Sequence, residues 1–179
     1  MTTDEWFVRL ARGNFEISVP EQRDLTVLQL GVFAGDATAW LLRNRHIALI
    51  DDVDTWQGDQ HVHADFAEVE SIYDERFAEE HRVHKHKMFT DEFWTVCDQQ
   101  YDFIYVDADH SSYQTLLDAL NAWRHLKPGG VMAFDDYLWE AQQGSLAFPK
   151  TGVDMFCHLV GNEMSILADN FQRWIRRNP

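Results

Sequence analysis

The sequence predicts an α/β fold in which helices cover a mostly parallel sheet. The prediction starts from two short apolar runs, 101–106 and 131–134, which flank a helical segment. Between them, apolar side chains recur at steps of three and four residues from Tyr113 to Leu126. Strand, helix and strand of this kind pair in parallel with a right-handed connection, so the carboxyl ends of both strands meet at one edge of the sheet. Open α/β sheets bind their ligands there.

Acidic residues follow both apolar runs of this segment. Asp107, Asp109 and His110 come directly after the first run, and Asp135 and Asp136 come directly after the second. We therefore expect both groups at the ligand-binding edge of the sheet.

Length and composition restrict the class of protein. The 179 residues suffice for a single domain over 1–179, with 1–24 as a helical lead-in and 25–179 as the core. The formal net charge of −15 disfavours nucleic acid and anionic membranes as partners. No apolar run approaches a membrane span, and the N-terminus lacks the positive charge of a signal peptide, so we expect a cytoplasmic protein. Two cysteines form neither a disulfide framework nor a zinc motif.

The remaining elements follow from the same patterns along the chain. Strands are expected where short runs are apolar or alternate, and helices where apolar residues recur at helical spacing. Thr90, followed by two acids, is expected to cap a helix. The expected order is a short helix over 4–10, a polar approach over 12–24, a strand over 25–30, a helix over 36–45, a strand over 47–53, an amphipathic helix within 59–82, a strand over 83–89, a helix from Thr90 to about Cys97, a loop over 138–149, a helix over 151–160, and strands over 164–167 and 171–175 around a turn at 168–170.

Gly31 and Gly35 frame the turn between the first strand and the following helix. Such a turn lets a ligand approach the backbone and the helix N-terminus closely, although a tight turn without any ligand is the alternative. Dinucleotide sites use G-x-G-x-x-G, whereas this turn has G-x-x-x-G. The spacing therefore favours a nucleoside without phosphates.

Three acids, Asp51, Asp52 and Asp54, close the second strand. In nucleotide-binding α/β folds, an acid about 20 residues beyond the glycine turn accepts hydrogen bonds from ribose hydroxyls. Any of the three fits that role, and the others are then solvated charges at a strand end.

Five histidines, at 61, 63, 81, 84 and 86, lie in the polar stretch that follows. They lack the fixed spacing of a zinc site, so we interpret them as surface or substrate-facing side chains rather than metal ligands.

Four motifs occur in the order of one known family. VLQLGVFAGDAT looks like a cofactor loop, DVDTWQGD like the end of a second strand, YDFIYVDADH like a fourth strand, and LKPGGVMAFDDY like a crossover and fifth strand. Over 27–176 the chain thereby resembles the class I S-adenosylmethionine-dependent methyltransferases, and among them the small bacterial group similar to the sugar and natural-product O-methyltransferases. The resemblance implies a Rossmann-like three-layer sandwich whose seven-stranded sheet is mostly parallel with an antiparallel C-terminal strand, and S-adenosyl-L-methionine as cofactor.

The resemblance also implies cofactor contacts. Gly31 and Gly35 match the backbone contacts to the methionine and ribose parts of the cofactor. Asp54, just before Thr-Trp, is the first choice for the ribose contact and Asp52 the second, because the sequence before VDTW is unusual. Thr90 matches the neighbourhood of the adenine.

Relatives that methylate sugar or catechol-like hydroxyls bind Mg²⁺ through acids after strands four and five. Those positions match Asp107, Asp135 and Asp136, and the family's histidine matches His110; Asp107 is also expected to contact the cofactor. A hard cation lowers the pKa of an acceptor hydroxyl while His110 takes the proton. Without a cation, three converging acids would repel one another and raise their own pKa values. The alternative is that these acids only cap turns and accept backbone amides.

The predicted function is O-methylation of a hydroxyl on a small molecule, either a sugar or a phenolic compound. The acceptor walls are expected from 58–82 and 138–151, where aromatic residues (Tyr73, Tyr137, Trp139 and Phe148) stand in or beside polar segments. Two other classes stay open: a nicotinamide-dependent oxidoreductase, which the missing G-x-G-x-x-G disfavours, and a noncatalytic binding or assembly protein. Seven tryptophans leave a homodimer open as well.

Overall fold

The structure is a computed structural model, and it describes residues 7–58, 64–139 and 145–179. The first residues of the expected N-terminal helix, the histidines at 61 and 63, and the middle of the expected loop over 138–149 lie outside the described residues. No helix in those three ranges is both long enough and apolar enough to cross a membrane.

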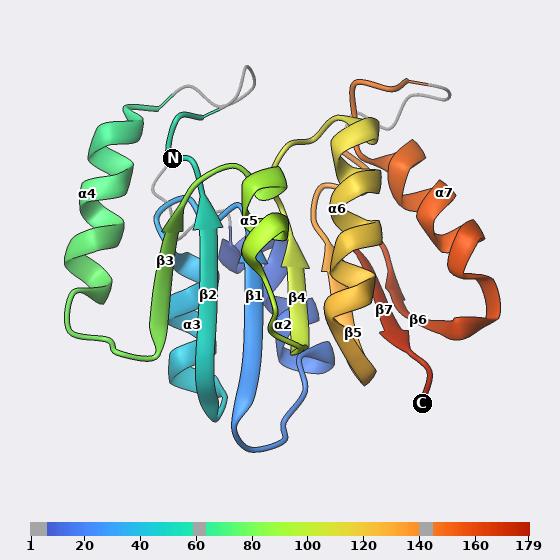
Figure 1. Cartoon of the computed structure of the whole chain (residues 1–179), viewed down its shortest axis with the longest axis horizontal. Coiled ribbons are helices and arrows are strands. Elements are labelled where there is room, and N and C mark those ends of the chain that lie inside the picture. Colours follow the sequence, from blue (N-terminus) through green and yellow to red (C-terminus); the bar gives the residue numbers. More distant parts are fainter. Residues whose placement is uncertain (1–6, 59–63, 140–144) are drawn as a thin grey trace.

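Seven strands form one sheet in the order β3-β2-β1-β4-β5-β7-β6 (Figure 1). β1 to β5 pair in parallel, whereas β7 lies antiparallel between β5 and β6. The predicted fold class, α/β with a mostly parallel seven-stranded sheet and an antiparallel C-terminal strand, is confirmed. The strands are β1 (Leu25–Leu30), β2 (Ile47–Asp54), β3 (Val83–Lys87), β4 (Tyr101–Val106), β5 (Leu126–Phe134), β6 (Met164–Asp169) and β7 (Arg173–Arg177).

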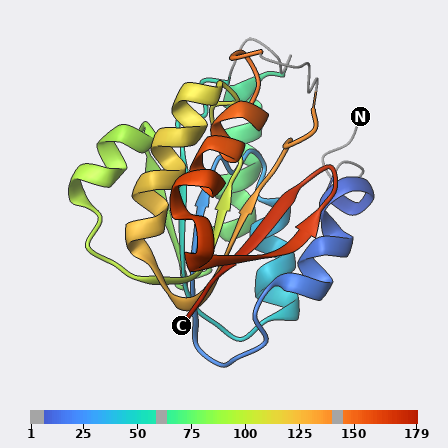
Figure 2. The same ribbon diagram turned by 90° about the vertical axis from the view of Figure 1, so that its right-hand side faces the viewer.

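Helices cover both faces of this sheet and complete a three-layer arrangement (Figures 1 and 2). The N-terminal helices and α3 pack on one face, and α5, α6 and α7 pack on the other. α4 packs against the turn that follows β1, through Val69 and Tyr73. The helices are η1 (Phe7–Ala11), α2 (Arg12–Ser18), α3 (Asp36–Asn44), α4 (Phe66–Phe77), α5 (Thr90–Val96), α6 (Ser112–His125), α7 (Lys150–Val160) and η2 (Gly161–Glu163).

β1 and β4 form the centre of the sheet and have the bounds that the sequence predicts. All six residues of β4 are buried, because helices cover the strand on both faces. A parallel strand in that position consists almost entirely of apolar residues, which is why its ends are sharp in the sequence. The carboxyl ends of β1, β2, β4 and β5 all reach the upper edge of the sheet in Figure 1.

The expectation of a polar approach over 12–24 is wrong for its first half, which forms α2. Phe7, Ala11 and Phe15 recur every fourth residue and are buried, so the chain does have an apolar helical face there. Phe15 is completely buried against the rings of Trp40 and Trp174. The surrounding charged residues hide this face in the sequence.

Several boundaries differ from those expected. β5 begins at Leu126, five residues before the expected strand at 131–134, and includes the Pro-Gly-Gly segment. Thr90 is the first helical residue of α5, and Phe89 holds the N-cap position, where its amide is bound by Glu92. The C-terminal strands extend to Asp169 and Arg177, so the turn between them comes later than expected.

Candidate active site

Two glycines shape the turn between β1 and α3. Gly31 and Gly35 both have a φ of +80°, in the left-handed region. A Cβ atom at Gly31 would lie 1.8 Å from the carbonyl oxygen of Asp107, and one at Gly35 would lie 2.3 Å from the Phe77 ring. The packing of the protein therefore requires both glycines, and it sets the turn directly against the end of β4. Their contacts to a cofactor stay predictions.

Asp54 holds this turn from the end of β2. One carboxylate oxygen accepts hydrogen bonds from the amides of Val32 and Phe33, at 2.8 and 2.9 Å. The other accepts the amide of Trp56 at 2.7 Å. A carboxylate has about four acceptor positions, so one position stays open to a ligand hydroxyl.

Asp52 lies in the interior instead. Its carboxylate accepts hydrogen bonds from Gln29, Thr38 and Tyr73, at 2.7 to 2.8 Å, and its side chain is completely buried. This position argues against a ribose contact through Asp52, our second choice, and leaves Asp54 as the candidate. Burial raises the pKa of Asp52 to about 6, although the three hydrogen bonds oppose that shift.

This buried carboxyl predicts a pH dependence of folding. Its pKa is about 6 in the folded protein and 3.8 ordinarily, so its stabilising contribution is complete below pH 3.8 and is lost as the pH rises through 6. Between pH 4 and 7, ionisation of Asp52 should lower the unfolding free energy of the protein by about 2 kcal/mol. We expect Asp52→Asn to remove this part of the pH dependence. Urea unfolding at pH 4, 5, 6 and 7 measures this difference, and parallel profiles for the two proteins would contradict it.

Asp51 faces the opposite side of the sheet from Asp52. It accepts the Tyr101 hydroxyl at 2.8 Å and lies 2.7 Å from the Nε2 atom of His86. His86 and the neighbouring His84 therefore surround a buried acid under α5, away from the turn at Gly31.

Thr90 lies at the start of α5, beside α6. The amide nitrogen of the Gln114 side chain donates to its hydroxyl at 3.2 Å and to Asp91 at 3.0 Å. Trp94 donates to the buried Asp118 at 2.9 Å. This polar contact fixes α5 against α6 next to the carboxyl end of β3, where the adenine is expected.

Asp107, His110 and Asp136 converge at the carboxyl ends of β4 and β5. One donor atom from each lies within 4.8 Å of the other two, and they form the candidate metal-binding group of the described residues. The Nε2 atom of His110 lies 3.2 Å from Asp136 and 3.5 Å from Asp107. Topology thus brings Asp107 and Asp136 together as the sequence predicts.

Asp107, His110 and Asp136 form what we call the acidic cluster, and the charge of each affects the pKa of the others. Burial alone lowers the pKa of His110, but hydrogen bonds and Coulombic attraction to Asp107 and Asp136 outweigh burial and raise the pKa to about 11. Burial raises the pKa of Asp107 to about 6, and its hydrogen bond with His110 opposes the shift. The two acids thus favour the protonated form of His110 while no cation is bound, and its role as a general base stays a prediction.

Asp135 does not join this cluster, contrary to the predicted metal site. Its carboxylate accepts the Tyr105 hydroxyl, the Gln172 amide at 3.0 Å and the backbone amide of Asp136 at 2.8 Å. Burial, with the nearby charges of Asp107 and Asp136, raises its pKa well above the usual range. The side chain points into the interior because Gln172, which directly precedes β7, supplies a donor there.

Aromatic rings border the cluster on the side of the loop after β5. The Trp139 ring meets the His110 ring edge to face at 5.1 Å and the Phe148 ring at 5.4 Å. Two other aromatic residues expected in the acceptor wall lie elsewhere. Tyr73 is buried against Asp52, and the buried Tyr137 hydroxyl contacts Asp154, Lys150 and Arg173.

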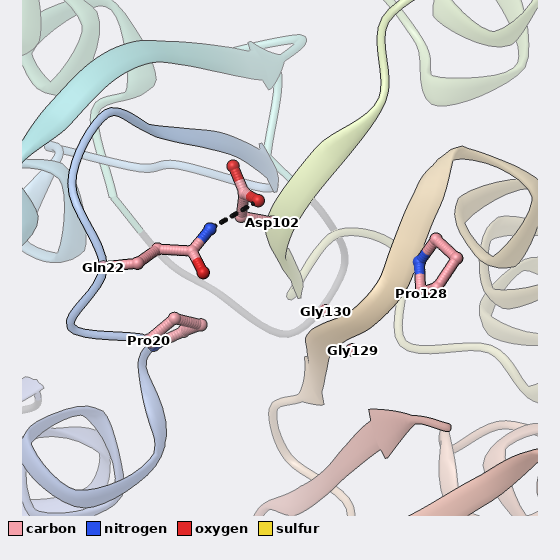
Figure 3. Close-up of a pocket in the computed structure, with 6 residues that line it drawn as sticks. All are labelled: Pro20, Gln22, Asp102, Pro128, Gly129 and Gly130. Carbon is pink, nitrogen blue, oxygen red and sulfur yellow. Dashed lines mark hydrogen bonds between the residues drawn. The ribbon is translucent and has the colours of Figure 1, made fainter. Parts of the chain in front are cut away.

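A separate hollow of about 100 Å³ opens at the other end of the central strands (Figure 3). Asp102, the second residue of β4, accepts a hydrogen bond from Gln22 at 2.7 Å on its wall. Asp102 also accepts hydrogen bonds from Lys127 and Thr26, so its carboxylate is well supplied with donors. The hollow lies at the amino end of β4 and is not part of the candidate active site.

The sequence model of a methyltransferase domain family matches residues 28–137. The match covers more than half of the 179 residues and includes the turn at Gly31, Asp54 and the acidic cluster. The chain belongs to this methyltransferase domain family. The resemblance to class I S-adenosylmethionine-dependent methyltransferases is thereby confirmed. No curated protein matches the chain.

Solved methyltransferase structures share the fold of this methyltransferase domain at low identity. The O-methyltransferase from Bacillus cereus, in complex with SAH, is 15% identical with a TM-score of 0.65, covering 100% of this chain and 93% of that one. The O-methyltransferase TomG from Streptomyces achromogenes, in complex with SAM, is 15% identical with a TM-score of 0.66, covering 88% and 74%. The N-methyltransferase NodS from Bradyrhizobium japonicum is 13% identical with a TM-score of 0.64, covering 98% and 96%.

The sequence interpretation did not include two side chains of the candidate active site. The Trp56 indole donates to the carbonyl of Phe33, and Arg76 donates to the carbonyl of Ala34. Trp56 stands in the DVDTWQGD motif next to Asp54, so its position carried a signal. Arg76 is one of several charged residues on α4, and nothing in the sequence distinguishes it.

Proposed function

We propose that this methyltransferase uses S-adenosyl-L-methionine to methylate a hydroxyl group of a small molecule, with the help of a divalent cation such as Mg²⁺. One observation carries the proposal. Gly31 packs against the backbone of Asp107, so the candidate cofactor turn and the acidic cluster are immediate neighbours. A methyl donor and an acceptor held at these two places would be adjacent.

The residues of the turn fit a nucleoside cofactor. Asp54 keeps one acceptor position for a ribose hydroxyl, while its other positions fix the turn. Thr90 and Gln114 border the expected adenine position. S-Adenosylmethionine, when bound, supplies a methyl group activated by its sulfonium charge. The role of the protein is then to hold the acceptor oxygen in line with that methyl group, which needs positioning more than covalent chemistry.

The acidic cluster fits a divalent cation. Asp107 and Asp136 offer the carboxylate oxygens that hard cations prefer, and His110 offers an imidazole nitrogen as a third donor. A bound cation supplies positive charge that lowers the pKa of a nearby hydroxyl. The positions of Asp107 and Asp136 on either side of His110 favour positive charge at this place. His110 as the catalytic base stays a prediction.

The surroundings of the cluster suit an uncharged acceptor. Trp139 and Phe148 provide ring faces, which bind sugars and phenolic rings alike. The acids around the cluster would repel an anionic acceptor. The two structural neighbours named as O-methyltransferases agree with oxygen as the accepting atom, whereas NodS is named for nitrogen. The carboxylates of the cluster favour a hard cation, and a hard cation prefers an oxygen ligand, so an acceptor hydroxyl fits this place.

Isothermal titration with S-adenosylmethionine and S-adenosylhomocysteine tests the cofactor, and NAD serves as the competing ligand. We expect saturable binding of the first two and none of NAD. The reverse result would favour a nicotinamide-dependent oxidoreductase, and no binding at all would remove the methyltransferase proposal.

Asp136→Asn tests the cation, with Asp109→Asn as its matched control. Asp109 is exposed in the same region, and within the described residues its side chain accepts the Ser111 amide, which asparagine also allows. We expect Asp136→Asn to weaken Mn²⁺ binding, followed by titration, at least 10-fold, because it removes one of two anionic ligands. We expect the control to bind Mn²⁺ like the unchanged protein. Equal binding by all three proteins would contradict the metal site. Separately, an acceptor screen with and without Mg²⁺ decides between sugars and phenols.

A further inference from the structure

The turn at Gly31–Gly35 is fixed through its carbonyl groups as well as its amides. While Asp54 binds the amides of Val32 and Phe33, the Trp56 indole donates to the Phe33 carbonyl at 2.9 Å. Arg76 donates to the Ala34 carbonyl at 2.6 Å and to the Asp36 carboxylate at 2.7 Å. Three side chains thus hold successive peptide groups of the turn: Asp54 binds the first two, and Trp56 and Arg76 bind one each.

The backbone of the turn explains why such support is needed. Phe33 has a φ of +54°, a left-handed conformation that is unfavourable for a residue with a side chain. Gly31 and Gly35 on either side are left-handed as well, so every second residue of the turn has a positive φ. A segment of this kind keeps one shape only where the surrounding structure over-determines it.

Both supporting side chains are themselves held in place. Trp56 is 4% exposed and contacts both the Tyr73 ring, at 4.9 Å, and the Lys85 ammonium group, at 4.5 Å. Arg76 lies 5.6 Å above the Phe77 ring and forms an ion pair with Asp36, the first residue of α3. Tyr73, Arg76 and Phe77 all belong to α4, so this helix supports the turn from below.

We propose that Trp56 and Arg76 are positioning residues for the cofactor. They direct the peptide groups at 33–35 and thereby hold the turn, with the Asp54 carboxylate bound to its amides, in a shape ready for the nucleoside. This inference rests on the proposed binding of S-adenosylmethionine to the turn. A role limited to general packing would instead lower stability and leave the affinity of the folded protein unchanged.

The variants separate these roles. Trp56→Phe removes the indole donor and keeps an aromatic ring, and Arg76→Met removes the guanidinium and keeps most of the stem. Arg76→Lys restores one donor and the charge. Arg82→Met is the matched control, because Arg82 pairs with the nearby Glu80 at the surface and, in the part of the chain that the structure describes, makes no side-chain contact with the turn.

Two measurements apply to each variant: titration with S-adenosylhomocysteine and hydrogen exchange of the peptide that contains residues 32–34. We expect Trp56→Phe to weaken binding about 3- to 10-fold and Arg76→Met about 10- to 100-fold, as the loss of a neutral and of a charged hydrogen bond predicts. Exchange should accelerate in both, Arg76→Lys should recover part of the affinity, and Arg82→Met should match the unchanged protein.

The outcomes distinguish this inference from the proposed function. If the unchanged protein binds and both variants bind equally well, the positioning role is wrong. If the unchanged protein does not bind S-adenosylhomocysteine, the proposed function is wrong, and exchange at 32–34 still reports whether the two side chains hold the turn. Unaltered exchange in both variants would then overturn the inference as well.

Discussion

Asp54→Ala is expected to weaken the binding of S-adenosylhomocysteine at least 100-fold. The substitution removes the acceptor of three backbone amides, those of Val32, Phe33 and Trp56, together with the position left for a ribose hydroxyl. Each amide left without a partner costs about 1 kcal/mol or more, so the turn at Gly31 would also lose its shape. A 100-fold loss corresponds to about 2.7 kcal/mol, which two or three such interactions supply.

Titration of folded Asp54→Ala measures this loss, and denaturant unfolding measures the accompanying destabilisation. Asp98→Ala is the control, because it changes the charge equally at an exposed position. The control should bind like the unchanged protein. A folded Asp54→Ala protein with unaltered affinity would exclude Asp54 from the cofactor site.

Gly31→Ala is expected to cost about 4 kcal/mol or more of unfolding free energy. Its Cβ would meet the carbonyl oxygen of Asp107 at 1.8 Å, and neither backbone moves freely. The amide of Gly31 is bound to Val53, and the amide of Asp107 is bound to Leu30, so a shift would break the ladder on both sides. Losses of this size arise where a buried clash adds to an unfavourable φ.

Gly129→Ala separates the two causes. Gly129 has nearly the same φ, +79°, but no atom lies within 4 Å of its added Cβ. We expect it to cost about 1–2 kcal/mol, the penalty of the left-handed backbone alone. Urea unfolding of both variants provides the comparison, and equal losses would show that the contact with Asp107 is of no importance.

The sequence predicts the frame of the site well and the direction of its side chains poorly. The carboxyl ends of parallel strands meet at one edge, which is why the convergence of Asp107 and Asp136 follows from topology alone. Whether Asp135 joins them depends on Gln172, a residue 37 positions farther along the chain, which binds the Asp135 carboxylate. No local pattern near Asp135 contains that information.

The same distinction applies to the acids of β2. Asp52 and Asp54 are two residues apart and face the same side of the strand, so alternation does not separate them. What separates them is depth: Asp52 meets Gln29, Thr38 and Tyr73 in the interior, whereas Asp54 has reached the turn. Those partners come from three other elements that are far from Asp52 in the sequence, so no local pattern around Asp52 reveals them.

The place of β7 in the sheet has a consequence for the synthesis of the protein. β7 pairs with β5 and with β6, so a growing chain that has not yet reached Arg173 leaves the edge of β5 without a neighbour. An open strand edge invites pairing with other chains. Gln172, which binds Asp135 beside the acidic cluster, is made at the same late moment. The sheet edge and the polar interior of the site are therefore completed together, after every other part of the site has been synthesised.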